Sequence, residues 1–73
     1  MLRVMPPLHI TTESEADGRW IGAVESMPGV LAYGATREEA IARAQALALR
    51  VIADRLDHGE LAGAPLSVVF EAA

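Results

Sequence analysis

Apolar and polar side chains alternate in the first half of the chain, which is the pattern of strands with one buried face. In residues 8–15, Leu8, Ile10 and Thr12 share one face and the residues between them share the other. Residues 19–25 and 30–33 repeat the pattern at shorter length. The spacing predicts three strands that pair as an antiparallel meander, with one face of the sheet against a helix.

Two short turn sequences separate these strands. Asp17-Gly18 is typical of a tight two-residue hairpin, because glycine adopts positive φ without strain. Pro28-Gly29 pre-sets the torsions of a type II turn, and Gly34 ends the third strand. Both sequences therefore predict a reversal of chain direction.

Residues 37–58 are rich in alanine, leucine, arginine and glutamate and predict one long helix. Thr36 and Glu39 form a capping box at its start, and Gly59 follows its end. The apolar side chains spread over roughly 200°, about twice the width of a stripe that faces one core. The helix is therefore predicted to have two apolar faces, and we expect Leu47 and Val51 to contribute to an oligomer interface. The apolar residues are Ala40, Ile41, Ala44, Leu47, Ala48, Leu49, Val51, Ile52 and Leu56.

One further strand is predicted after the helix. Residues 61–65 form a glycine-, alanine- and proline-containing connector, and residues 66–71 are rich in β-forming side chains. After so long a crossover this strand returns to the sheet. The predicted fold is α+β in the order βββαβ, a small antiparallel sheet packed against one long helix. We expect residues 1–73 to form a single domain with residues 1–7 as a lead-in.

Length and composition narrow the class of protein. A chain of 73 residues buries only about 60% of its unfolded surface. There is no cysteine to form a disulfide, so we expect a homodimer or homotetramer to complete the stabilisation. The apolar runs are far shorter than the roughly 20 residues of a membrane-spanning helix. Residues 1–7 lack the apolar segment of a signal peptide, so a cytoplasmic location is expected.

The chain is acidic, with 10 acidic and 6 basic residues, all of the latter arginine, and a net charge of −4. Nucleic-acid-binding domains carry basic patches, so direct nucleic-acid binding is not expected, and a basic protein partner is favoured. Glu13, Glu15 and Asp17 cluster at the first hairpin, which is either a solvated tip or a docking surface for such a partner. Trp20 and Tyr33 are either core anchors or interface residues.

Catalysis is not expected. The chain has no cysteine nucleophile, its serines have no base at a recognisable spacing, and Glu38 and Glu39 are adjacent on a helix and point apart. His9 has no cysteine or ligand-spaced carboxylate nearby and is interpreted as a surface or packing residue. His58 is at the end of the helix, where a positive charge is favoured, and is interpreted as structural. No metal or cofactor is predicted.

Residues 17–40 resemble the N-terminal domain of the HicB-like antitoxin family. They carry an Asp-Gly-x-aromatic start, a Met-Pro-Gly turn, a glycine ahead of the helix and a Thr-x-Glu-Glu-Ala helix start. The matching residues are Asp17, Gly18, Trp20, Met27, Pro28, Gly29, Gly34, Thr36, Glu38, Glu39 and Ala40. The resemblance extends more loosely from about Leu8 to the last strand. Val30 departs from the pattern, because many members have cysteine there, and many members continue into a DNA-binding segment that this sequence lacks.

The resemblance implies an antitoxin that binds and masks a HicA-type toxin, an RNA-cleaving protein with a double-stranded-RNA-binding-like fold. A toxin that grips RNA must be basic, which suits an acidic partner. The alternative is an orphan oligomeric interaction or scaffold module without a toxin. A small-ligand binder is a third possibility, but no residue pattern supports it.

Overall fold

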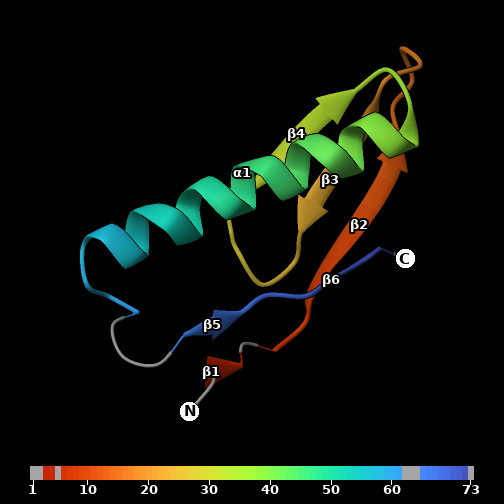
Figure 1. Cartoon of the computed structure of the whole chain (residues 1–73). Coiled ribbons are helices and arrows are strands. Elements are labelled where there is room, and N and C mark those ends of the chain that lie inside the picture. Colours follow the sequence, from red (N-terminus) through yellow and green to blue (C-terminus); the bar gives the residue numbers. More distant parts are fainter. Residues whose placement is uncertain (1–2, 5, 62–64, 73) are drawn as a thin grey trace.

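The computed structural model describes residues 3–4, 6–61 and 65–72. A four-stranded sheet carries one long helix across one of its faces (Figure 1). The strands lie in the spatial order β4-β3-β2-β6. Their bounds are Leu8–Ser14 for β2, Trp20–Val24 for β3, Leu31–Gly34 for β4 and Phe70–Ala72 for β6, and α1 spans Arg37–Asp57. The predicted α+β fold, with three strands, a helix and a returning strand, is confirmed.

The sheet is mixed, whereas the sequence predicted an antiparallel one. The strands β2, β3 and β4 form the expected antiparallel meander, but β6 runs parallel to β2. The direction follows from the crossover. Because α1 carries the chain back along the sheet from the end of β4, the next strand starts at the end where β2 starts.

The last predicted strand, residues 66–71, is divided in two. Its first part, β5 (Leu66–Ser67), pairs in parallel with β1 (Arg3–Val4), which lies in the segment predicted as a lead-in. Pro6 and Pro7 then interrupt the ladder, because proline has no N–H to donate. Pairing resumes where the Leu8 N–H donates to the Val69 carbonyl at 2.9 Å. Within the predicted connector, residues 62–64 lie outside the described residues.

The first hairpin has a longer loop than predicted. The Glu15 N–H donates to the Arg19 carbonyl at 2.7 Å, so the loop holds three residues and Gly18 takes its left-handed position at φ 90°. The second turn has the expected form. The Val30 N–H donates to the Met27 carbonyl at 3.0 Å, and Gly29 has φ 88°.

The helix starts at the predicted capping box. The Glu39 N–H donates to Thr36 Oγ1 at 3.1 Å, and Glu39 Oε1 accepts from the Ala35 N–H at 3.2 Å. Gly59 follows the helix with φ 75°, as predicted for a C-terminal glycine. Among the described residues, no helix combines the length and the apolar character needed to cross a membrane.

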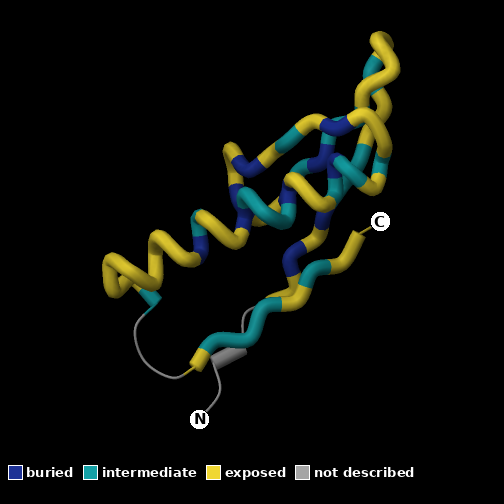
Figure 2. The backbone as a smooth tube through the Cα atoms, turned by 45° about the horizontal axis from the view of Figure 1, so that its top comes forward, coloured by how far each residue is buried: buried dark blue, intermediate teal, exposed yellow. Residues whose placement is uncertain are grey.

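The core lies between α1 and the sheet, where buried segments of both face each other (Figure 2). Ala40, Ala44, Ala48 and Ile52 recur every four residues and form the buried stripe of the helix. The small alanines allow a close approach, and Ile10 is fully buried beneath them. The other buried apolar residues are Leu8, Val24, Met27 and Val30.

The helix is longer than the sheet it covers. A helix of 21 residues extends about 31 Å, whereas β3, with 5 residues, extends about 17 Å. The C-terminal half of α1 therefore projects past β3 and β4 (Figure 1). The molecule measures 45 × 21 × 16 Å and its radius of gyration is 13.4 Å, above the roughly 11 Å of a compact domain of this length.

Candidate interaction surface

One face of the sheet is covered by α1 and the other is open. Gly22 and Gly34 face the helix, because a Cβ at either position would lie within 3 Å of the Ala40 backbone. Alternation along the strands therefore turns the intervening residues to the open face. The apolar part of the open face is formed by Ile21, Ala23, Leu31 and Tyr33, which lie opposite one another in the β3–β4 pairing at one edge of the sheet.

These four residues are apolar, and the two on β4 are accessible to solvent. Leu31 is 44% exposed and Tyr33 is 39% exposed, while Ile21 and Ala23 are half-buried between their neighbours on the sheet. Thr11 continues the surface onto β2, where it pairs with Ala23. A sheet face of this kind is suited to packing against the apolar part of another protein.

Arg19 fixes the position of the Tyr33 ring. The guanidinium carbon of Arg19 lies 4.5 Å from the ring centroid, and Nε of the same side chain is 2.7 Å from Asp17 Oδ2. The Arg19 N–H also donates to Asp17 Oδ1 at 3.0 Å. These hydrogen bonds from the Arg19 backbone and side chain lower the pKa of Asp17 below its ordinary value of 3.8. The aromatic side chain is thus held by a cation whose charge Asp17 already balances.

Three carboxylates lie on the open face beside this apolar group, on β2 and β6 and at the end of β3. Glu13 pairs with Ile21 across the strands, and the Glu25 N–H donates to the His9 carbonyl at 3.0 Å, which continues the β2–β3 ladder. Glu71 lies beside His9 on β6, with Oε1 3.5 Å from the imidazole Nδ1. All three glutamates are exposed. The surface therefore has an apolar half on β3 and β4 and an acidic margin toward β2 and β6.

The excess of acidic residues lies on the sheet side of the molecule. The strands β2, β3, β4 and β6 with their turns carry five carboxylates and one arginine, whereas α1 carries four arginines and four carboxylates. The sheet side thus has a net charge of −4, and the helix is neutral overall. The sheet-side carboxylates are Glu13, Glu15, Asp17, Glu25 and Glu71.

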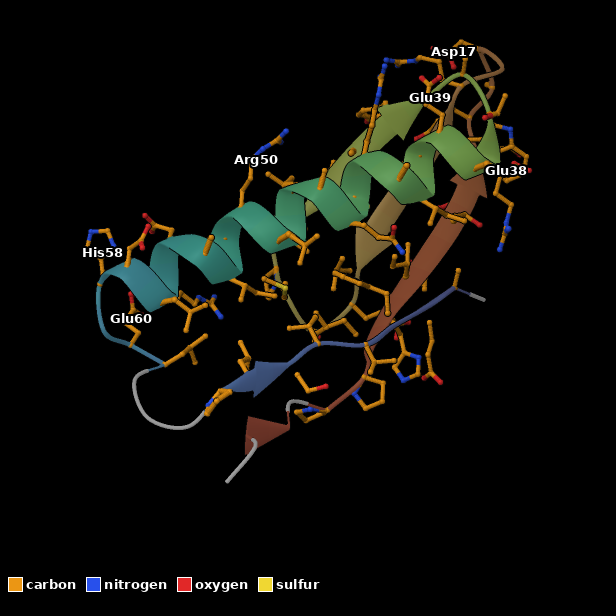
Figure 3. The ribbon with its side chains drawn as sticks, viewed as in Figure 1. Asp17, Glu38, Glu39, Arg50, His58 and Glu60 are labelled. Atoms are coloured by element: carbon orange, nitrogen blue, oxygen red, sulfur yellow. The ribbon has the colours of Figure 1, made fainter. Side chains whose placement is uncertain are left out.

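The structure separates the residues that the sequence predicted as one partner-binding group. Glu13 and Tyr33 lie on the open face. Asp17 is at the tip of the hairpin (Figure 3), tied to Arg19, and Glu15 is half-buried where the hairpin loop closes. Trp20 pairs with Ser14 and Gly34 on the helix side of the sheet, half-buried and outside the core cluster. The open face and Trp20 are therefore on opposite sides.

The structure also gives the surroundings of the two residues predicted at an oligomer interface. Leu47 and Val51 are half-buried and pack against the core of their own chain. The exposed large apolar residues of α1 are instead Leu49 and Leu56, at 48% and 44% exposure. The sequence showed two apolar faces on the helix but not which residues belong to each.

Sequence reasoning missed several residues that β3, β4 and β6 contribute to the open face. Ile21, Leu31, Glu25 and Glu71 had no distinguishing motif, and only the strand register brings them together. The alternation of β3 was a signal, since it placed Ile21 and Ala23 on one face.

The structure also has an open hollow of about 210 Å³ under the C-terminal half of α1, lined by Pro6, Pro7, Leu8, Ser26, Met27 and Arg55.

No group of histidine or acidic side chains in the described part of the chain has the arrangement of a metal site. Comparison of this chain with family models, with curated proteins and with solved structures found no match.

Proposed function

We propose that this chain is a non-catalytic protein-binding domain that binds a basic protein through the open face of its sheet. The observation that carries the proposal is the exposed pair Leu31 and Tyr33, in the apolar half of a face whose other half carries Glu13, Glu25 and Glu71. Apolar and aromatic residues at the centre of an interface supply most of the binding energy. Charges at the margin mainly raise the association rate and select the partner.

The motif residues favour an antitoxin role within this class. They resemble the HicB-like family, whose members mask a HicA-type toxin, and an RNA-cleaving toxin needs a basic surface. An acidic face complements such a surface. In this proposal the antitoxin acts in the cytoplasm, and it covers basic residues that the toxin needs for RNA. The alternative is a module that assembles proteins without a toxin partner.

Co-expression with the product of a neighbouring gene tests the biological part of the proposal. We expect that product to arrest growth alone and to be harmless together with this chain. If it is not toxic, or if it remains toxic with this chain present, the antitoxin role is wrong and the scaffold alternative remains.

Binding kinetics test the surface itself. Replacing Glu13 and Glu25 by lysine should slow association with the basic partner and weaken its dependence on salt, because both side chains lie on the open face. Replacing Asp54 and Glu60 by lysine changes the net charge equally, but on and just beyond α1, and should leave the rate almost unchanged. Equal effects of the two double variants would show that net charge, and not this face, governs binding.

Dissociation kinetics test the apolar group on β3 and β4. Tyr33→Ala should speed dissociation and weaken affinity by about 30-fold or more, as for a central aromatic residue of an interface. Arg55→Ala removes an exposed side chain of α1, away from the open face, and is the control that should not affect dissociation. An unchanged dissociation rate for Tyr33→Ala would contradict a binding role for the open face.

A further inference from the structure

The outer face of α1 carries a second apolar stripe that the fold does not cover. Its members are separated alternately by four and three residues, which is the spacing of a seam between two helices. Ala42, Leu49, Ala53 and Leu56 are exposed and Ala46 is half-buried. From this stripe we infer that α1 of a second copy of the chain packs against α1, with the two helices antiparallel.

The stripe is distinct from the part of α1 that faces the core. Ala40, Ala44, Ala48 and Ile52 are buried on the sheet side, and at about 100° per residue the stripe lies on the other side of the helix axis. None of the five positions of the stripe, from Ala42 to Leu56, carries a charged side chain. A surface helix of a monomer normally places polar side chains there. Leu49 and Leu56 are instead among the most exposed large apolar residues of the described chain.

The sequence of the stripe is self-complementary. Leu49 is at its centre, with Ala42 seven residues before it and Leu56 seven residues after it. A two-fold axis near Leu49 therefore sets the small Ala42 against Leu56 of the second copy. Two-fold symmetric interfaces require this kind of match, because the same patch is used on both sides.

Charge favours the helix over the sheet as the site of the second copy. The same axis brings Asp57 of the second copy, next to Leu56, toward Arg43, whose Nη2 also lies 3.2 Å from Glu39 Oε1 of its own helix. The helix is neutral overall, with its four arginines and four carboxylates. The sheet side has a net charge of −4, so two open faces would repel each other. Arg50, beside Leu49, projects away from the sheet (Figure 3).

The monomer also has a reason to associate. In the described part of the chain, nine apolar side chains are buried, and three of them are alanine. A core this small needs further stabilisation. Packing α1 against α1 buries its two exposed leucines and supports the half of the helix that extends past the sheet. The seam spans about 21 Å, which is short for an interface, so we expect association in the micromolar range.

Such a dimer is compatible with the proposed function but does not rest on it. Because the helices are on the inside, both open sheet faces remain on the outside. The dimer therefore presents two equivalent acidic faces, one on each end, to two basic partners. This arrangement would give avidity toward a dimeric partner.

Sedimentation velocity over a range of concentrations tests the inference. The unmodified chain should pass from monomer to dimer, and its melting temperature should rise with concentration. Leu49→Glu should weaken self-association by about 30-fold or more, because it places a charge in the seam. Leu31→Glu adds the same charge to the open face and should leave the dimer intact. A monomer at all concentrations, or equal loss in both variants, would overturn the inference.

Cysteine cross-linking locates the axis independently. The chain has no cysteine, so each single-cysteine variant reports on one position. Leu49→Cys should form a covalent dimer on mild oxidation at low micromolar concentration, because the two Leu49 residues meet at the axis. Leu31→Cys should remain a monomer on a non-reducing gel. Cross-linking through Leu31 and not through Leu49 would place the contact on the sheet and contradict the helix seam.

Discussion

The backbone of Gly22 lies directly against that of Ala40. A Cβ at Gly22 would lie 2.8 Å from the Ala40 carbonyl oxygen, and a Cβ at Gly34 would lie 2.5 Å from the Ala40 nitrogen. Two glycines on adjacent strands thus set the distance between the sheet and the first turns of α1. Alternation along β3 and β4 then places Ile21, Leu31 and Tyr33 on the open face.

Gly22→Ala should therefore destabilise the domain. The added methyl group meets backbone atoms that cannot rotate away, and we expect a loss of about 1–3 kcal/mol in the free energy of unfolding. Gly18→Ala is the control, since nothing lies within 4 Å of its Cβ and only its φ of 90° opposes the change. Gly18→Ala should lower the free energy of unfolding by about 1 kcal/mol. Urea denaturation measures both, and equal losses would contradict the close contact at Ala40.

Thr36→Ala should remove the N-terminal cap of α1. The hydroxyl accepts from the Glu39 N–H at 3.1 Å, and its loss leaves that donor without its side-chain acceptor. We expect a loss of about 1 kcal/mol in the free energy of unfolding. Thr36→Ser retains the hydroxyl and should remain close to the original stability. If both variants melt alike, the cap contributes nothing.

The stability of the domain should depend on pH through Asp17. Its pKa is lowered in the folded chain by hydrogen bonds from Arg19, so the unfolded chain binds the proton more readily. The stabilisation is present above the ordinary pKa of 3.8 and is lost as the pH falls through the lower folded pKa. Asp17→Asn should flatten the decline of stability in that acidic range. NMR titration of the carboxyl group should show a midpoint below 3.8, and a midpoint above it would contradict the hydrogen bonds.

Trp20→Ala should have a modest effect on stability. Trp20 is half-buried and lies outside the core cluster, so the loss should be smaller than the roughly 3–5 kcal/mol of a core tryptophan. Ile10→Ala removes a fully buried side chain and should cost about 2–5 kcal/mol. Because Trp20 is on the helix side, its loss should not slow association with a basic partner. A larger loss for Trp20 than for Ile10 would place it in the core.

Specific DNA binding is not expected from the isolated chain. The four arginines of α1 are balanced by four carboxylates on the same helix. One such pair is Arg43 and Glu39, with Nη2 3.2 Å from Oε1. No basic stripe forms along α1, and the sheet side is acidic. A gel shift of the gene's own promoter at physiological salt and nanomolar protein would contradict this expectation.

Local signals in the sequence determined much of the fold. The capping box at Thr36 and the glycine at residue 59 set the ends of α1, because both act within one turn of the helix. Alternation in residues 8–15 and 19–25 determined the first two strands and the faces of their side chains. The acidic composition predicts a basic partner, whatever the fold.

The tertiary structure alone decided which side chains form the surfaces. The register of β3 against β4 brings Tyr33 opposite Ile21, and the register of β2 against β6 brings Glu71 beside His9. The sequence could not assign Leu47 to the core and Leu49 to solvent, because both lie at the margin of a broad apolar helix surface. Their burial depends on where a sheet narrower than the helix ends. Contacts between residues distant in the chain set that limit, and local pattern contains no information about them.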